Sequence, residues 1–283
     1  MLWGEVIAKS ASYLEQKGVA DGRAAAELLA GRLLHLGRGL LGSAASQEVS
    51  EPQLAAMRRG LARLATGEPV QYVIGEWDFR SLTLKCDRRA LIPRPETEEL
   101  VTRVLKSLKG GEVVIDAGTG TGAIILSIAK EAKGGGLFIG TDISEDALAL
   151  AQENARLTGL GDKVKFVAMD GLDDFDEPQS VDVIVSNPPY IKTADCLKLD
   201  RNVRDFEPRI ALDGGESGLD FYERYLGDAV NLLKIGGKVF FEIGESQGGE
   251  VIALMRSYGF ENIKVEKDYA GHDRYASAEL NYG

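Results

Sequence analysis

The run Asn-Pro-Pro-Tyr at 187–190 combines residue types that suit the binding of a planar amino group. Its two prolines fix the backbone and remove two N–H donors, which leaves carbonyl oxygens free to accept hydrogen bonds. The Asn187 amide adds another acceptor, and the ring of Tyr190 can stack on a planar group. Two acceptors can hold both hydrogens of an –NH₂ group and direct its lone pair at an electrophile. The alternative is an ordinary rigid turn, since Asn-Pro dipeptides mark turns.

A second run, Asp-Ala-Gly-Thr-Gly-Thr-Gly at 116–122, follows a short apolar stretch and precedes a helical pattern. Glycines there allow the backbone to approach a ligand closely, and the helix N-terminus offers unpaired N–H groups. Asp142 follows about 20 residues later, where nucleotide-binding folds place an acid on the ribose hydroxyls. Asp116 would repel a pyrophosphate and suits a cationic amino-acid group. The loop also fits the G-x-G-x-x-G/A pattern of NAD enzymes, so its spacing leaves both ligands open.

Alternating strand and helix patterns surround these two runs. The expected helices lie at 123–129, 145–157 and 219–233, and the expected strands at 113–115, 137–140, 164–167, 181–185 and 238–243. Parallel neighbours need crossover connections, so this alternation predicts an α/β fold with a doubly wound, mostly parallel sheet. Ligands bind beyond the carboxyl ends of such strands, which is where both runs fall.

A small helical domain is expected before the sheet. Apolar residues at helical spacing predict a helix over 21–36 with Asp21 as its cap. A second helix is predicted over 50–67, where Ser50 and Gln53 make a capping box. The alternating run 77–84 predicts a strand or small hairpin. We therefore expect a helical domain at 1–75, a linker with a β-hairpin at 76–94 and a larger domain at 95–283.

Composition places the chain among soluble globular proteins. With 44% hydrophobic and 27% charged residues among 283, it is neither a disordered nor a collagen-like protein. No apolar run approaches the roughly 18 residues of a membrane span, and no secretory signal is apparent, so a cytoplasmic protein without a membrane partner is expected. Cys86 and Cys196 are expected to stay reduced. Two cysteines and two histidines make a dedicated zinc site unexpected.

Charge is spread unevenly along the chain, whose net charge is −11. Residues 1–90 carry 12 Lys and Arg against 10 Asp and Glu, whereas residues 91–283 carry a net −13. Binding to a long nucleic acid favours a basic surface, because neutralised phosphates drive it. The acidic excess therefore argues against a large nucleic-acid footprint.

Taken together, these runs resemble the S-adenosylmethionine-dependent amino-methyltransferases, whose signature is [Asn/Asp]-Pro-Pro-[Tyr/Phe/Trp]. The run Leu-Ile-Pro-Arg-Pro-Glu-Thr-Glu at 91–98 narrows this, because it is similar to the linker motif of the HemK/PrmC family, the protein-glutamine methyltransferases of peptide chain release factors. Further matches are Asp142-Ile143-Ser144, Glu207-Pro208, Ala211-Leu212, Gly214-Gly215, Gly218-Leu219, Glu242-Ile243-Gly244, Gln247, Ala270-Gly271 and Arg274. The resemblance runs from about residue 67 to 276.

This resemblance implies a class I, Rossmann-like methyltransferase fold that binds S-adenosyl-L-methionine. The glycine loop would pack on the methionine part, Asp142 would hold the ribose, and the Asp170–Gly171 position would line the adenine. Relatives often carry a large side chain where this chain has Gly171. The implied cofactor residues are Asp116, Gly118, Thr119, Gly120, Thr121, Gly122, Asp142, Asp170, Gly171 and Asn187. The implied substrate residues are Asn187, Pro188, Pro189 and Tyr190, of which Asn187, Pro188 and Tyr190 are the implied catalytic residues.

The implied reaction is direct methyl transfer to the glutamine amide of the Gly-Gly-Gln (GGQ) motif of class I release factors. The helical domain would recognise that partner, and the protein is expected to be a monomer. A rival reading is a methyltransferase for exocyclic amino groups of adenine or guanine in nucleic acid, which the acidic charge disfavours. Two further rivals are a nicotinamide-dependent oxidoreductase, which gives 187–190 no role, and a non-catalytic cofactor-binding protein.

Overall fold

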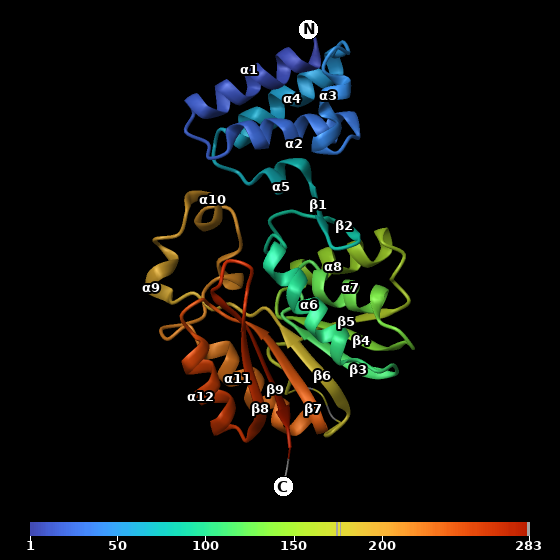
Figure 1. Cartoon of the computed structure of the whole chain (residues 1–283), viewed down its shortest axis with the longest axis vertical. Coiled ribbons are helices and arrows are strands. Elements are labelled where there is room, and N and C mark those ends of the chain that lie inside the picture. The colour runs from blue at the N-terminus through green and yellow to red at the C-terminus, as the bar shows by residue number, and fades with distance from the viewer. Residues whose placement is uncertain (174, 176, 282–283) are drawn as a thin grey trace. The chain divides into compact units, whose positions relative to one another are not determined.

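The computed structural model describes residues 1–173, 175 and 177–281 of the chain. The chain divides into two compact units (Figure 1). The first comprises Met1–Trp77 together with Asp200–Phe206, and the second comprises Asp78–Leu199 and Glu207–Gly283. Each unit contains its own cluster of buried apolar side chains. Among the described helices, none combines the length and apolar character that crossing a membrane requires.

The first unit is mainly helical. Its helices are α1 (Trp3–Gln16), α2 (Gly22–Leu34), η1 (Arg38–Leu40), α3 (Leu41–Ala44), α4 (Glu51–Leu64), α5 (Val70–Ile74) and α10 (Arg201–Arg204). The apolar faces of α1, α2 and α4 pack on one another, and their shared core includes the fully buried side chains of Trp3, Leu14, Met57 and Leu64.

Two helix predictions in this unit have different outcomes. The helix expected at 50–67 is confirmed as α4, and Gln53 Oε1 accepts the backbone N–H of Ser50 at 3.1 Å, as a capping box requires. The helix expected at 21–36 is confirmed as α2, but its predicted cap is wrong. Asp21 adopts a left-handed φ of 52°, and its side chain makes no capping hydrogen bond. The helix ends at Leu34, because His35 is also left-handed. Helix α1 was not located from the sequence.

A two-stranded sheet follows the helices. Strands β1 (Glu76–Phe79) and β2 (Leu82–Lys85) confirm the hairpin expected at 77–84. The turn residue Arg80 anchors the hairpin to the second unit's helices, because its guanidinium donates to Glu131 at 2.9 Å and to the Glu98 carbonyl at 2.7 Å. The hairpin thereby fixes the start of the segment that runs from Cys86 to Arg94.

The second unit is built on a seven-stranded sheet in the order β5-β4-β3-β6-β7-β9-β8. Its strands are β3 (Glu112–Ala117), β4 (Gly136–Asp142), β5 (Val164–Ala168), β6 (Val181–Ser186), β7 (Leu233–Glu242), β8 (Phe260–Lys267) and β9 (Asp273–Leu280). Neighbours from β5 to β7 are parallel, whereas β9 is antiparallel to both β7 and β8. The predicted α/β fold with a mostly parallel, doubly wound sheet is therefore confirmed.

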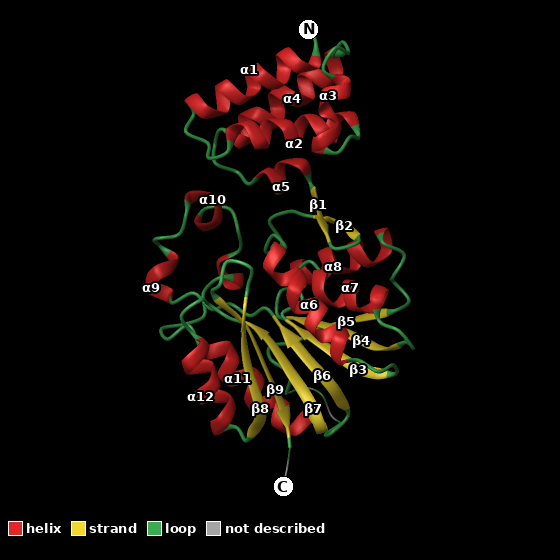
Figure 2. Cartoon of the chain, viewed as in Figure 1, coloured by secondary structure: helices red, strands yellow, loops and turns green. Residues whose placement is uncertain are grey.

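Helices cover both faces of this sheet (Figure 2). Helices α6, α7 and α8 pack on one face in one apolar cluster, and α11 and α12 pack on the other. The helices of this unit are α6 (Pro95–Ser107), α7 (Ala123–Glu131), α8 (Glu145–Leu157), α9 (Thr193–Cys196), η2 (Arg209–Ala211), α11 (Asp220–Leu232) and α12 (Gly248–Ser257). Helices therefore cover both faces of the sheet, and loops follow the carboxyl ends of its parallel strands.

Two strands and a helix at the end of the chain were not expected from the sequence. They are α12, β8 and β9. Strand β8 lies at the sheet edge, where only Phe260 of its eight residues is buried. An edge strand that exposes most of its side chains carries no apolar run, and this explains why the pattern did not reveal it.

Candidate functional site

The strand order reverses between β3 and β6, and this switch point brings the two predicted runs together. From β3 the chain continues to β4 and β5 on one side, and β6 continues to β7 on the other. Ser186 Oγ at the end of β6 donates to the carbonyl of Ala117 at the end of β3, at 2.6 Å and fully buried. Open α/β sheets bind ligands beyond this point. The glycine run and the Asn-Pro-Pro-Tyr run therefore share one edge.

A pocket lies at this edge, within the second unit. Its walls come from the glycine run, the ends of β4 and β5, the run after β6, and the segments 89–97 and 208–211. Nine residues predicted for the site line it: Gly118, Thr119, Gly120, Thr121, Asp142, Asp170, Gly171, Asn187 and Pro189. The other four predicted residues lie outside the lining set: Asp116, Gly122, Pro188 and Tyr190.

The glycine run follows β3 as a tight loop. Gly118, Gly120 and Gly122 have φ values of 73°, 55° and 81°, in the left-handed region that side chains rarely adopt. Thr119 fixes the loop, because its N–H donates to the Thr141 carbonyl at 2.8 Å and its hydroxyl donates to Asp116 Oδ2 at 2.6 Å. The loop therefore presents backbone to the pocket and turns its one acid inward.

Asp116 is fully buried beneath this loop. Among the described residues, its Oδ1 has no hydrogen-bond donor. Burial raises the pKa of Asp116 to about 7, although the bond from Thr119 acts in the opposite direction. An unpartnered buried oxygen is costly, and this one lies behind the loop, because Asp116 is not among the residues that line the pocket.

Asp142 ends β4 and faces the pocket. Its Oδ2 accepts the N–H of Gly120 and its Oδ1 accepts the N–H of Ser144, both at 2.9 Å. Burial raises its pKa, and the backbone N–H groups act against that rise. Each carboxylate oxygen can accept a second hydrogen bond, which leaves capacity for two hydroxyl groups. The residue thus joins the glycine run to α8 and still offers acceptors to a ligand.

The pocket's far end is formed around Gly171, which has a φ of 87°. A Cβ at this position would lie 2.7 Å from Arg224 Nε, so the arginine occupies the space of a larger side chain. Arg224 pairs with the Asp170 carboxylate and donates to the Asp170 carbonyl at 2.9 Å. Apolar surface comes instead from three other lining residues, Ile143, Met169 and Phe221.

Asn187 lies at the opposite end of the pocket, and one hydrogen bond holds its side-chain amide. Its Nδ2 donates to Thr97 Oγ1 at 3.2 Å. Among the described residues, no donor reaches Asn187 Oδ1 or the Pro188 carbonyl. Two acceptors are therefore available next to each other in the chain. Tyr190 is half-buried and packs against the core, its pKa is raised to about 12 by burial, and its carbonyl accepts from Gln247 at 3.2 Å.

Glu207 belongs to a sequence match to which no role was assigned. In the structure its side chain joins two segments of the pocket wall, and we call it the strut. Its buried carboxylate accepts the N–H of Ile92 at 3.0 Å and pairs with Arg94 at 2.5 Å. Ile92 and Arg94 line the pocket, and so does Pro208, which follows the acid in the chain. The acid therefore ties two distant wall segments together.

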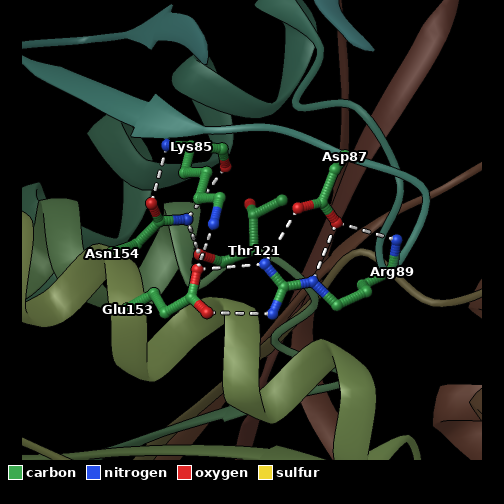
Figure 3. Close-up of polar contacts among 6 residues, drawn as sticks. All are labelled: Lys85, Asp87, Arg89, Thr121, Glu153 and Asn154. Carbon is green, nitrogen blue, oxygen red and sulfur yellow. Dashed lines mark hydrogen bonds and ion pairs between the residues drawn. The ribbon is translucent and has the colours of Figure 1, made fainter. Parts of the chain in front are cut away.

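Asn154 is a further residue that sequence reasoning missed. Its Oδ1 accepts the N–H of Lys85 at 2.7 Å, and its Nδ2 donates to the carbonyls of Lys85 at 3.1 Å and Thr121 at 2.9 Å (Figure 3). The fully buried amide thus clamps the glycine run to the end of β2. The available signal was one polar residue on the face of α8 that carries Ala147, Leu150, Ala151 and Ala155.

Beside it, Arg89 lies between two acids (Figure 3). Its guanidinium donates to Asp87 at 2.8 Å and to Glu153 at 3.0 Å. Glu153 also accepts from Lys85 at 2.7 Å, and these two cations hold its pKa at about 2. Arg89 itself lines the pocket. The pairs hold the segment that enters the pocket wall against α8.

The arrangement as a whole can bind a ligand with a nucleoside at one end and a planar amino group at the other. Two hydroxyls at Asp142 and an apolar ring near Gly171 fit the ribose and the adenine of S-adenosylmethionine. Among the described residues, no group of three or more His, Cys, Asp or Glu side chains is arranged to hold a metal ion.

Two family models match separate parts of the chain. Residues 5–75 match the family model described as the PrmC N-terminal domain, and residues 108–242 match a methyltransferase domain. A release factor glutamine methyltransferase of Moorella thermoacetica is 40% identical over 273 residues, which cover 95% of each chain. One from Bacillus cereus is 36% identical over 283 residues, which cover 98% of each.

Solved structures agree on the fold. A methyltransferase from Pyrococcus furiosus superposes with a TM-score of 0.55 at 20% identity, covering 82% of this chain and 100% of its own. A ribosomal protein L11 methylase from Lactobacillus delbrueckii gives a TM-score of 0.51 at 19% identity, covering 68% of this chain and 82% of its own. These similarities concern the fold alone.

Proposed function

The chain belongs to the release factor glutamine methyltransferase family, and from this premise we propose the reaction and substrate that its site serves. The protein is an S-adenosylmethionine-dependent methyltransferase of the protein-glutamine type. Its substrate is the side-chain amide of the glutamine in the GGQ motif of class I peptide chain release factors. The observation that carries this proposal is the pair of available acceptors, Asn187 Oδ1 and the Pro188 carbonyl, which are adjacent in the chain and of which the first belongs to a residue that lines the pocket.

The cofactor half of the pocket is assigned to the glycine run and to Asp142. Asp142 would accept the ribose hydroxyls, and the buried Oδ1 of Asp116 would be the acceptor nearest the methionine part. Because Gly171 carries no side chain, the adenine would pack on Ile143, Met169 and Phe221 instead. These three side chains would take the place of the large side chain that relatives often carry at the Gly171 position.

The residues after β6 perform the substrate half of the reaction. S-adenosylmethionine would supply an electrophilic methyl group, whose bond to sulfur breaks as its bond to the amide nitrogen forms, so that S-adenosylhomocysteine leaves and the methylated nitrogen loses one proton. A glutamine amide is a weak nucleophile, since its lone pair is delocalised into the carbonyl. Asn187 Oδ1 and the Pro188 carbonyl would accept its two N–H groups, which stabilises the positive charge that builds on nitrogen. They also aim the nitrogen at the methyl carbon. Tyr190 would flank the amide, with Pro189 in the lining.

The helical unit is the proposed recognition module for the release factor. We assign it to residues 1–75, with 76–94 as the linker that carries the hairpin and 95–283 as the methyltransferase domain. Its net charge is mildly positive, whereas residues 91–283 carry −13. The protein would act as a monomer in the cytoplasm, where release factors are found. Neither a membrane nor a nucleic acid would be its partner.

Mass spectrometry tests the proposal directly. A purified class I release factor is incubated with the protein and S-adenosylmethionine, and peptides that span the GGQ motif are sequenced. A gain of one methyl on the glutamine is expected, and a release factor with that glutamine changed to alanine should gain none. If cofactor binding is confirmed but no methyl appears, the substrate assignment is wrong, and adenine or guanine amino groups become the next substrates to test.

A further inference from the structure

Asn187 is the end of a chain of hydrogen bonds that runs into the core. Asn187 Nδ2 donates to Thr97 Oγ1 at 3.2 Å, and the Thr97 hydroxyl donates to Glu242 Oε2 at 2.7 Å. Thr97 is only 4% exposed and Glu242 only 2%. The three residues come from the loop after β6, the first turn of α6 and the end of β7. They are joined through the interior and share no stretch of sequence.

The order of donors in this chain follows from the acid at its end. While Glu242 is ionised, its carboxylate can only accept hydrogen bonds, so the single hydroxyl proton of Thr97 points at Glu242. The lone pairs of Thr97 Oγ1 then face Asn187, and they can be met only by the NH₂ side of its amide. Asn187 Oδ1 is thereby turned away from Thr97. The opposite orientation would present N–H donors to the N–H groups of an incoming amide.

Glu242 has no other evident task that would explain its burial. Within the described residues, no cation lies close enough to form a salt bridge with its carboxylate. Burial raises its pKa to about 7, and a buried acid without an ion pair lowers stability relative to an apolar residue. Its backbone carbonyl accepts from Tyr222 Oη at 2.9 Å, which fixes the end of β7. The hydrogen bond to Thr97 explains why a carboxylate is present at this buried position despite its cost in stability.

We propose that Glu242 and Thr97 are positioning residues that set the orientation of the Asn187 amide, so that its oxygen rather than its nitrogen meets the substrate. This inference rests on the proposed function, because it concerns the acceptor that the function assigns to Asn187. We call these two hydrogen bonds the relay: Thr97 Oγ1 donates to Glu242 and accepts from Asn187. The ionised carboxylate of Glu242 fixes that direction. Neither residue has to touch the substrate nitrogen.

Variants of Thr97 test the relay. Thr97→Val keeps the shape but removes the hydroxyl, so the Asn187 amide loses its partner and its fixed orientation. We expect kcat for the release factor to fall roughly 10-fold to 100-fold, with the dissociation constant for S-adenosylmethionine unchanged. Thr97→Ser keeps the hydroxyl and should restore most of the rate. Ser107→Ala removes a hydroxyl at the other end of α6, which donates to the Val104 carbonyl of the same helix at 2.7 Å, and should leave kcat unchanged, which controls for effects on the helix.

A double-mutant cycle separates positioning from general damage. If Thr97 acts only through Asn187, the variant Thr97→Val/Asn187→Ala should be no slower than Asn187→Ala alone, within about two-fold. The same should hold for Glu242→Gln, whose amide can donate to Thr97 and reverse the relay. Additive losses in both cycles, or an active Thr97→Val enzyme, would overturn the inference. The unmutated protein is assayed alongside, and its failure to methylate the release factor would instead contradict the proposed function.

Discussion

The carboxylate of Glu207 accepts the backbone N–H of Ile92 at 3.0 Å, although 115 positions separate the two residues. The same carboxylate pairs with Arg94, so one buried acid holds the segment before α6 against the segment before η2. Both segments line the pocket on the side of Asn187. One side chain from outside either predicted motif thus joins two wall segments at the substrate end.

Glu207→Ala should widen this end and lower stability. The change leaves the buried N–H of Ile92 without an acceptor, which costs about 1–3 kcal/mol. Denaturant unfolding should show this loss, and KM for the release factor should rise more than the dissociation constant for S-adenosylmethionine. Glu207→Gln retains an acceptor for Ile92 and should lose less than half as much stability. Equal losses in the two variants would contradict the strut.

Asn187→Ala removes the proposed amide acceptor from the substrate end. We expect kcat to fall roughly 10²–10³-fold, the loss typical of one positioned group in a preorganised site. The affinity for S-adenosylmethionine, measured by calorimetry, should stay nearly intact. Asn231→Ala removes an exposed asparagine from the second unit and serves as the matched control. Turnover of Asn187→Ala at the rate of the unmutated protein would remove Asn187 from the mechanism.

Asp142→Ala should weaken cofactor binding. Two hydrogen bonds to a charged group are lost, and we expect a loss of about 1.5–3 kcal/mol in binding free energy. Isothermal titration calorimetry measures it directly. Asp146→Ala removes the same charge from an exposed position in the first turn of α8 and should leave the affinity close to that of the unmutated protein. If both variants bind alike, Asp142 does not hold the ribose.

The relay through Glu242 predicts a pH dependence of the rate. The carboxylate has a pKa of about 7, so its ionised fraction falls as pH is lowered through that value. Protonated Glu242 can donate to Thr97 and reverse the relay, and kcat should therefore decline below about pH 7. The charged and titratable groups that influence Glu242 are Arg94, Glu96, Tyr190, Tyr222, Arg274 and Tyr275. Glu242→Gln should abolish this limb of a kcat-versus-pH profile, and a limb that persists would assign it elsewhere.

The raised pKa of Glu242 also affects the stability of the fold. Its contribution to stability falls as pH rises, whereas kcat is expected to rise over the same range. Glu242 has an ordinary value of 4.5 and a folded value of about 7, so the folded state binds more protons between these two pH values. Its contribution to the free energy of unfolding therefore falls as pH rises from about 4.5 to about 7. Thermal unfolding of Glu242→Gln should lack this component. A difference between the two proteins that stays constant across the window would contradict the raised pKa.

Asn154→Ala should release the glycine run from β2. The substitution removes three hydrogen bonds from a fully buried site and leaves a small cavity, which together cost about 2–4 kcal/mol of unfolding free energy. Cofactor affinity should fall as well, because the Thr121 carbonyl loses its anchor. Gln152→Ala, at an exposed neighbouring position on α8, should change stability by less than about 0.5 kcal/mol. Retained stability in Asn154→Ala would show that the clamp is unimportant.

The sequence by itself was sufficient for the elements whose signal is local. The glycine run, the Asn-Pro-Pro-Tyr run and the alternation of strands and helices between 112 and 243 are each contained in short stretches, so the sequence alone predicts each of them. The exposed strand β8 and the left-handed Asp21 were not, since an edge strand lacks an apolar pattern and a cap depends on where the preceding chain arrives.

Tertiary structure alone decided how those runs are held and oriented. Thr97 lies 90 positions from Asn187 and 145 from Glu242, yet hydrogen bonds of 3.2 Å and 2.7 Å join them. Such a chain leaves no periodic trace, because a polar residue that faces the core looks in sequence like one that faces solvent. The motifs determine which atoms are available to do chemistry, and only the packing of α6 and β7 around the switch point determines which way the Asn187 amide faces.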